Sequence, residues 1–337
     1  MTPMLGIMAS GISASKLVAY IVVGHSTSPF ISAYPWSSGF GTKYANPATL
    51  PTGNGAGVSF NPTGTAIAVA HSVSPYISTY PWSPGFGTKY ADPATLPTGD
   101  GAGVAFNPAG TAIAIAHDIS PNITAYPWSA GFGTKYADPA TLPTGSGGGV
   151  TFNPAGTVIA VAHDNSPYVT AYPWSAGFGT KYADPAALAG QGGKWVAFNS
   201  AGTNIALAHG TSPFISAYPW SAGFGTKYAN PATLPTGLGR GVAFNPAGTA
   251  IAVAHTGSPY ITTYPWSSGF GTKYADPATL PADTGRNVAF NPAGNAIAVA
   301  HSSSPYISTY PWSAGFGTKY ADPATLPTGN GNGVAFI

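Results

Sequence analysis

The sequence predicts an all-β protein, a seven-bladed β-propeller of four-stranded blades, and three observations predict it. A histidine, a Ser-Pro pair and Tyr-Pro-Trp-Ser recur in that order seven times, at a fixed interval of 46 residues. Apolar residues alternate with a period of two, as in strands, and no segment shows helical periodicity. Four short strands in a unit of this length make one propeller blade, which buries its apolar faces by stacking on its neighbours. The seven histidines are His25, His71, His117, His163, His209, His255 and His301.

One repeat shows how the strands of a blade are predicted. Val104–Phe106 is a short β-prone run, and Asn-Pro-Ala-Gly ends it as a turn. Thr111–His117 alternates, with isoleucines on one face and alanines on the other, and Asn122–Tyr126 is β-branched and aromatic. Phe132–Tyr136 is a weaker fourth strand, and Ala137–Gly149 is a connector rich in proline and glycine. The alanine face predicts that bulky residues of the next blade pack against it.

The two ends of the repeat array predict how the ring closes. The last copy of the first strand, at Val334–Phe336, has no second strand after it. The first copy of the later strands, Val18–Ala45, has only a degenerate first strand before it. We therefore expect the C-terminal strand to complete the first blade, which leaves no unpaired sheet edge between the termini. Residues 16–337 are then one propeller domain, and residues 1–15 are an N-terminal arm or anchor.

Composition limits the function classes. The chain has 337 residues, only 6% of them charged, no glutamate and a net charge of +2. It carries no basic stripe, so we expect no nucleic-acid partner. No run approaches the roughly 18 apolar residues of a membrane span, and residues 1–15 lack the basic and apolar regions of a secretory signal. Cysteine is absent, which excludes disulfides and thiolate metal sites. A weakly charged surface suits a protein that works within an assembly.

The copies differ mainly in two loops, the pair after each histidine and the connector before each Val-x-Phe. In propellers these loops share one rim, where binding residues commonly lie. Cations occupy one equivalent position in three successive connectors, next to a unique tryptophan, and carboxylates lie on the preceding blades. The residues of this predicted rim surface are Lys194, Trp195, Arg240, Arg286, Asp100, Asp118 and Asp164. One interpretation is a docking or ligand surface with Trp195 as an aromatic anchor; the other is neutral drift in solvated loops.

Other repeated residues have simpler interpretations. Histidines on separate blades are too far apart to share an ion, and short ligand spacings are absent, so we expect no metal. The histidines instead cap strands and bond their Ser-Pro turns. The repeated tryptophans could stack on sugars but favour core packing. No Ser/His/Asp set or unique acid–base pair stands out, so we expect no catalytic residues, no cofactor and no enzyme activity.

Val-Ala-Phe-Asn-Pro-Ala-Gly-Thr, followed by Tyr, Trp-Ser and Gly, resembles the units of WD-repeat and YVTN-type propellers. The resemblance covers residues 16–337 and recurs seven times in phase. Serine follows the tryptophan where those repeats have aspartate, and the histidine follows the second strand. The buried polar tetrad that WD repeats carry is therefore not transferred to this chain.

Met4–Ser13 resembles an N-terminal segment of tailed-bacteriophage structural proteins. That resemblance implies a non-enzymatic virion protein of the tail or capsid, assembled in the host cytoplasm and carried on the extracellular particle. Its partners would be other virion proteins, through the arm or the rim, and a host-surface glycan. The alternatives are a lectin-like propeller outside any virion, a consensus-engineered propeller, and a propeller enzyme such as a lactonase, which the missing carboxylate cluster disfavours.

Overall fold

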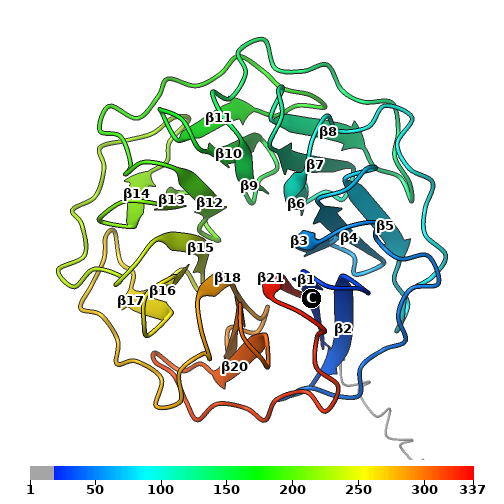
Figure 1. Cartoon of the computed structure of the whole chain (residues 1–337). Coiled ribbons are helices and arrows are strands. Elements are labelled where there is room, and N and C mark those ends of the chain that lie inside the picture. The colour runs from blue at the N-terminus through cyan, green and yellow to red at the C-terminus, as the bar shows by residue number, and fades with distance from the viewer. Residues whose placement is uncertain (1–18) are drawn as a thin grey trace, which may run out of the picture.

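Residues 19–337 are described by a computed structural model, and they form seven three-stranded antiparallel sheets arranged in a ring (Figure 1). We number the blades along the chain and count the sheet β21-β1-β2 as blade 1. The inner strands are β3 (Gly55–Phe60), β6 (Gly101–Phe106), β9 (Gly147–Phe152), β12 (Gly193–Phe198), β15 (Gly239–Phe244), β18 (Gly285–Phe290) and β21 (Gly331–Phe336). The middle strands are β1 (Ala19–His25), β4 (Ala66–His71), β7 (Ala112–His117), β10 (Val158–His163), β13 (Asn204–His209), β16 (Ala250–His255) and β19 (Ala296–His301). The outer strands are β2 (Ile31–Trp36), β5 (Ile77–Pro81), β8 (Ile123–Pro127), β11 (Val169–Pro173), β14 (Ile215–Pro219), β17 (Ile261–Pro265) and β20 (Ile307–Pro311).

The predicted seven-bladed all-β fold is confirmed, but each blade has three strands and not the four expected. The segment after the outer strand makes only an isolated bridge, such as Trp128 with Phe132. The amide of Gly133 still donates to the carbonyl of Pro127 at 2.9 Å. Because Pro127 has no N–H to donate to the carbonyl of Gly133, the ladder of hydrogen bonds cannot continue outward. The predicted fourth strand is therefore a bridged edge.

The C-terminal strand closes the ring as predicted. β21 pairs with β1, with Val22 opposite Ala335, and β1 pairs in turn with β2. β21 also contacts the inner strands β18 and β3 on either side of it. The expected arm of residues 1–15 and the phage-like segment Met4–Ser13 lie outside the described residues. Within residues 19–337 no helix is long and apolar enough to cross a membrane.

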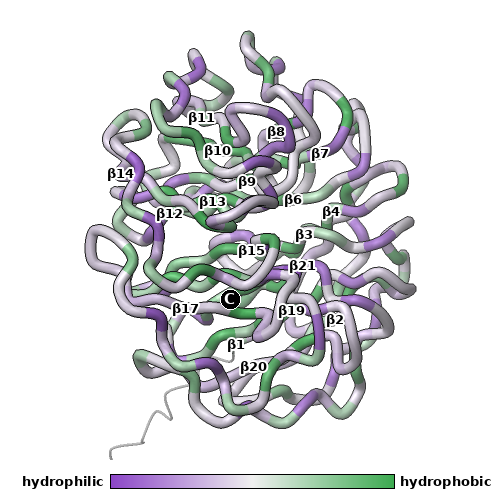
Figure 2. Tube along the Cα trace, turned by 60° about the vertical axis from the view of Figure 1, so that its left-hand side comes forward, coloured by the Kyte–Doolittle hydropathy of each residue, from purple (hydrophilic) through white to green (hydrophobic). Residues whose placement is uncertain are grey.

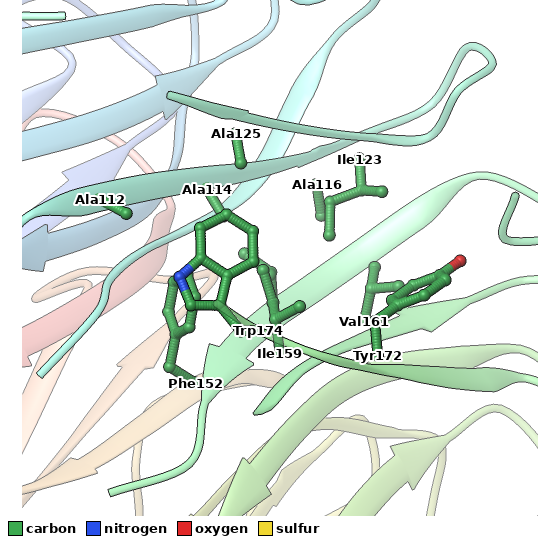
Figure 3. Close-up of a cluster of buried hydrophobic side chains, with 11 residues drawn as sticks. Ala112, Ala114, Ala116, Ile123, Ala125, Phe152, Ile159, Val161, Tyr172 and Trp174 are labelled. Atoms are coloured by element: carbon green, nitrogen blue, oxygen red, sulfur yellow. The ribbon is translucent and has the colours of Figure 1, made fainter. Parts of the chain in front are cut away.

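Small residues of one blade face bulky residues of the next, as the alternation predicted. Ala112, Ala114 and Ala116 of β7 pack against Phe152, Ile159 and Trp174 of blade 4 (Figure 3). The isoleucines on the other face of β7 pack toward the alanines of blade 2. Figure 2 shows hydrophobic stretches along many of the strands, alternating with more hydrophilic ones. A methyl group on one side of each interface leaves room for a ring on the other.

The repeated Tyr-Pro-Trp motif ties each blade to its neighbours. The indole of Trp128 is 5% exposed and meets Tyr90, Phe106 and Phe132 edge to face. The hydroxyl of Tyr126 donates to the carbonyl of Thr95 in the arriving connector at 2.7 Å. These tryptophans are core residues, as favoured, and their faces are not open to a sugar.

Candidate ligand site at the inner rim

Two sets of loops meet on one rim of the ring, as the sequence predicted. The connector threonine Thr52 donates from its hydroxyl to the carbonyl of Ser74, at 2.8 Å, in the turn between β4 and β5. The amide of Asn54 donates to the hydroxyl of Ser72 at 3.2 Å. Threonines at the same position in most other connectors make the first of these bonds. The rim is therefore a hydrogen-bonded surface on which the variable residues are held in place.

The seven histidines stand below this rim and are fully buried. His25 donates from Nδ1 to the carbonyl of Thr27 at 2.8 Å, so its Nε2 accepts from the hydroxyl of Ser32 at 3.0 Å. Burial lowers the pKa of each histidine to about 4. Every imidazole is thus neutral and bonds the outer strand through Nε2, and those of His25, His71, His117 and His209 also bridge to the turn, as predicted. Within residues 19–337 no group of three histidine or acidic side chains could hold a metal ion.

The residues that distinguish one blade from another sit at the second position of the inner strands. The strand pairing shifts register around this position, as it does between Gly239 and Gly241. A β-bulge of this kind re-aims one side chain away from the ladder. The glycine before it is required, because a Cβ at Gly239 would lie 2.2 Å from the carbonyl oxygen of Phe214. The seven bulge residues are Ala56, Ala102, Gly148, Lys194, Arg240, Arg286 and Asn332.

Five of these seven residues line one pocket of about 300 Å³, which we call the axial pocket: Ala56, Lys194, Arg240, Arg286 and Asn332. The three cations come from the successive blades 5, 6 and 7, and we call them the cation arc. Blades 2, 3 and 4 place only Ala56, Ala102 and Gly148 at the same level. The lining of the pocket therefore consists of three cations and two uncharged residues, Ala56 and Asn332.

The cation arc carries charge that the protein does not fully neutralise. Burial lowers the pKa of Arg286, and the charge of Arg240 lowers it further. The Nε atoms of Arg240 and Arg286 are buried and bond to no protein group. Lys194 is paired, with its Nζ 2.6 Å from Oδ1 of Asp164 on the neighbouring blade. Two adjacent guanidinium groups with free donors favour an anionic ligand, especially one with several oxygens.

The structure gathers part of the predicted rim surface and separates the rest from it. Lys194, Arg240 and Arg286 converge on the axial pocket, and Asp164 joins it through its ion pair. They lie on the inner strands, however, and not in connector loops as expected.

Two predicted carboxylates belong to a different part of the rim. The carboxylate of Asp118 accepts from the amide of Asp100 at 2.7 Å within blade 3, and neither residue lines the pocket. Burial raises the pKa of Asp100, and the charge of Asp118 adds to the effect.

Trp195 is half-buried and packs toward blade 6. A Cβ at Gly149, in the strand before it, would lie 2.8 Å from its ring. The tryptophan therefore wedges between blades, where the other copies have glycine or asparagine.

Sequence reasoning missed Asn332 and Ala56 as pocket residues. Asn332 donates from Nδ2 to the carbonyl of Gly55 at 2.9 Å and continues the polar side of the pocket into blade 1. The signal was present, because both residues stand at multiples of 46 from Lys194. Comparing that single repeat position across all seven copies would have found them.

No protein-family model matches the chain, and no curated protein matches its sequence. Solved structures do match its fold. The periplasmic gluconolactonase PpgL of Pseudomonas aeruginosa is 14% identical, with a TM-score of 0.72 over 95% of this chain and 99% of that one. A candidate 6-phosphogluconolactonase of Bacteroides uniformis is 16% identical, with the same TM-score and coverage. A protein of Lactobacillus plantarum is 17% identical, with a TM-score of 0.78 over 95% of this chain and 100% of that one.

These likenesses show the fold, and they correct the expected function. The expectation of a non-enzymatic phage virion protein is wrong, because the similar structures include propellers named as a gluconolactonase and as candidate 6-phosphogluconolactonases. No comparison supports a phage protein or a carbohydrate-binding lectin. The prediction gave more weight to the ten phage-like residues, which lie outside the repeats, than to the propeller fold, which enzymes also have.

Proposed function

We propose that the protein is an enzyme that hydrolyses an anionic sugar lactone in the axial pocket. The cation arc carries this proposal: three consecutive blades each place a cation on one side of a pocket of about 300 Å³. The propellers of similar fold that are named as gluconolactonase and 6-phosphogluconolactonase supply the reaction class.

The two sides of the pocket suit the two parts of such a substrate. A phosphate or carboxylate would accept hydrogen bonds from the guanidinium groups of Arg240 and Arg286, which line the pocket. Ala56 has a small apolar side chain and leaves room for an uncharged ring. A guanidinium near the ring carbonyl would also stabilise the oxyanion that forms when water attacks it.

We assign the role of general base to Asp164, the ion-pair partner of the pocket residue Lys194. Its Oδ1 is 2.6 Å from Lys194 Nζ, which holds it beside the pocket. In the proposed step Asp164 accepts a proton from water, and the water oxygen bonds to the lactone carbonyl carbon. The ring C–O bond breaks, the ring oxygen takes that proton from Asp164, and the products are the open-chain hydroxy acid and the regenerated carboxylate.

Lactone hydrolysis, followed by proton release in a weakly buffered solution, tests the proposal. We expect turnover of 6-phosphogluconolactone, and tighter calorimetric binding of 6-phosphogluconate than of gluconate. Arg240→Ala and Arg286→Ala should each weaken product binding roughly 10- to 100-fold, because a hydrogen bond to a charged group contributes about 1.5–3 kcal/mol. Asp164→Asn should lower the turnover rate about 10²-fold or more without weakening binding.

Lys135→Ala is the matched control, because it removes one positive charge from an outer connector, where Lys135 pairs with Asp138. Its binding and turnover should equal those of the unaltered protein. Equal losses in Lys135→Ala and Arg240→Ala would mean that net charge, and not the axial pocket, governs binding. Absence of turnover with every lactone offered would overturn the proposed reaction.

A further inference from the structure

The bulge residues change in character around the ring. Blades 5, 6 and 7 carry the cation arc, blade 1 carries Asn332, and blades 2, 3 and 4 carry alanine or glycine. Asn332 is thus the one amide among the seven bulge residues. Its strand, β21, contacts the inner strands that hold Arg286 and Ala56, and all three residues line the axial pocket. Asn332 therefore follows directly after the cation arc along the ring.

Glycines on both sides fix the backbone that carries Asn332. A Cβ at Gly331 would lie 2.2 Å from the carbonyl oxygen of Tyr306, and one at Gly333 would lie 2.2 Å from that of Ala56. Neither contact tolerates a side chain, so the strand is packed closely at both neighbours of Asn332. The amide is therefore presented from a backbone with little room to shift.

A hydrogen bond to the next blade sets the orientation of this amide. Nδ2 of Asn332 donates to the carbonyl of Gly55, the first residue of β3, at 2.9 Å. A backbone carbonyl can only accept, so the nitrogen and not the oxygen of the amide must face Gly55. Among residues 19–337, no group donates to Oδ1 of Asn332. The amide thus keeps a hydrogen-bond acceptor in reserve.

The charges around the pocket limit what this acceptor can bind. An anionic oxygen is repelled by Oδ1 and attracted by Arg240 and Arg286, which line the same pocket. An ammonium group could donate to Oδ1, but the same two guanidinium groups repel it. A neutral donor remains, and on a sugar acid that donor is a hydroxyl group.

We propose that Oδ1 of Asn332 accepts a hydrogen bond from a hydroxyl group of the ligand, so that the axial pocket selects polyhydroxy acids over acids without hydroxyls. The proposal rests on the proposed function and names the part of the substrate that Asn332 binds. Asn332 acts in specificity and takes no part in bond breaking. An analogue without the hydroxyl is disfavoured because it leaves the acceptor unpaired when it excludes water from the pocket.

Calorimetric titration of two ligands tests the proposal without any turnover. One ligand is 6-phosphogluconate, and the other is 6-phosphohexanoate, which has the same length and end groups but no hydroxyls. We expect the unaltered protein to prefer 6-phosphogluconate. Asn332→Ala should reduce that preference about 2- to 10-fold, the factor that corresponds to one net hydrogen bond, and should leave the binding of 6-phosphohexanoate unchanged.

The repeat itself supplies the variants. Alanine stands at this position in blades 2 and 3 and glycine in blade 4, so an inner strand accepts either residue. Asn332→Gly should lose the same preference, and it replaces Asn332→Ala if that variant fails to fold by circular dichroism. Asn165→Ala is the matched control, because Asn165 donates from Nδ2 to the carbonyl of Thr144 at 2.8 Å in a rim loop outside the pocket. It should bind both ligands as the unaltered protein does.

Three results would overturn the proposal. Equal weakening of both ligands by Asn332→Ala would show that the amide only supports the strand. An unchanged preference would show that another group binds the hydroxyls. Absence of binding by either ligand would overturn this proposal together with the proposed function. The two are otherwise separable, because a lost preference in a protein without turnover refutes the reaction alone, and turnover with an unchanged preference refutes only the role of Asn332.

Discussion

At the scale of single residues, the seven buried histidines make the stability of the fold depend on pH. All seven bond an outer-strand hydroxyl through Nε2, and four of them also donate from Nδ1 to a turn carbonyl, as His25 does between Ser32 and Thr27. Protonation would place a charge in a fully buried site and break the bond that Nε2 accepts. The seven histidines thus support the fold while they are neutral and lower its stability only in acid.

We predict acid unfolding between about pH 6 and pH 4. Burial lowers the histidine pKa from 6.5 to about 4 in the folded protein, so below pH 6.5 the unfolded chain binds protons that the folded protein does not. The free energy of unfolding therefore falls as the pH falls through this window. A shift of this size contributes up to about 3 kcal/mol per histidine. The sum for seven histidines exceeds the unfolding free energy of typical domains, which is about 5–15 kcal/mol.

Urea unfolding at pH 7 and pH 5 measures this effect. His163→Gln should reduce the proton uptake on unfolding by about one and flatten the pH dependence accordingly. An unfolding free energy that is constant over this pH range would refute the role given to the histidines.

At the scale of elements, the blade interface depends on its alanine face. A strand that reads Ala-Ile-Ala-Ile-Ala buries both faces. Its alanine face packs against bulky residues of one neighbouring blade, and its isoleucine face packs against alanines of the other. The rule holds from blade to blade because the same strand supplies the small side of one interface and the large side of the next.

Enlarging one alanine should therefore cost stability. Ala114 is fully buried against blade 4, and Ala114→Leu should lower the free energy of unfolding by about 1–3 kcal/mol through overpacking. Ala137→Leu, on the exposed connector, is the control and should change it by less than about 0.5 kcal/mol. Guanidinium unfolding followed by tryptophan fluorescence measures both, and equal values for the two variants would contradict the packing described.

At the scale of the whole molecule, the ring is held shut by one strand. Among residues 19–337, β21 is the strand that pairs with the inner edge of β1, and its removal would expose a row of unpaired backbone groups. The charged residues also take on meaning only at this scale, because Lys194, Arg240 and Arg286 are each 46 residues apart in sequence yet line one pocket.

Deleting residues 331–337 should open the ring. We expect the shortened chain to self-associate through β1, as measured by light scattering after size exclusion. A synthetic peptide of sequence Gly-Asn-Gly-Val-Ala-Phe-Ile should restore the size of the unaltered protein by adding back the strand. A peptide of the same composition in scrambled order serves as the control. A shortened chain with the size and Tm of the unaltered protein would show that β21 does not close the ring.

The sequence by itself determined the ring, its seven blades, the strand alternation, the closing strand and the buried tryptophans. Each of these follows from a pattern that repeats in phase, and seven copies average out local ambiguity. The repeat also marked the position of the cation arc, because substitutions stand out against near-identical copies.

Only the tertiary structure decided which of those substitutions meet. It brought Lys194, Arg240 and Arg286 together with Asn332 and left Asp100 and Asp118 elsewhere on the rim. It also places Trp195 between two blades and gives each blade three strands. The physical reason is that curvature brings the inner strands together, while bulges and prolines set where each side chain points. The 46-residue period specifies neither the curvature of the ring nor the direction in which a side chain points. A sequence pattern therefore gives the order of the blades but not which residues meet in the site between them.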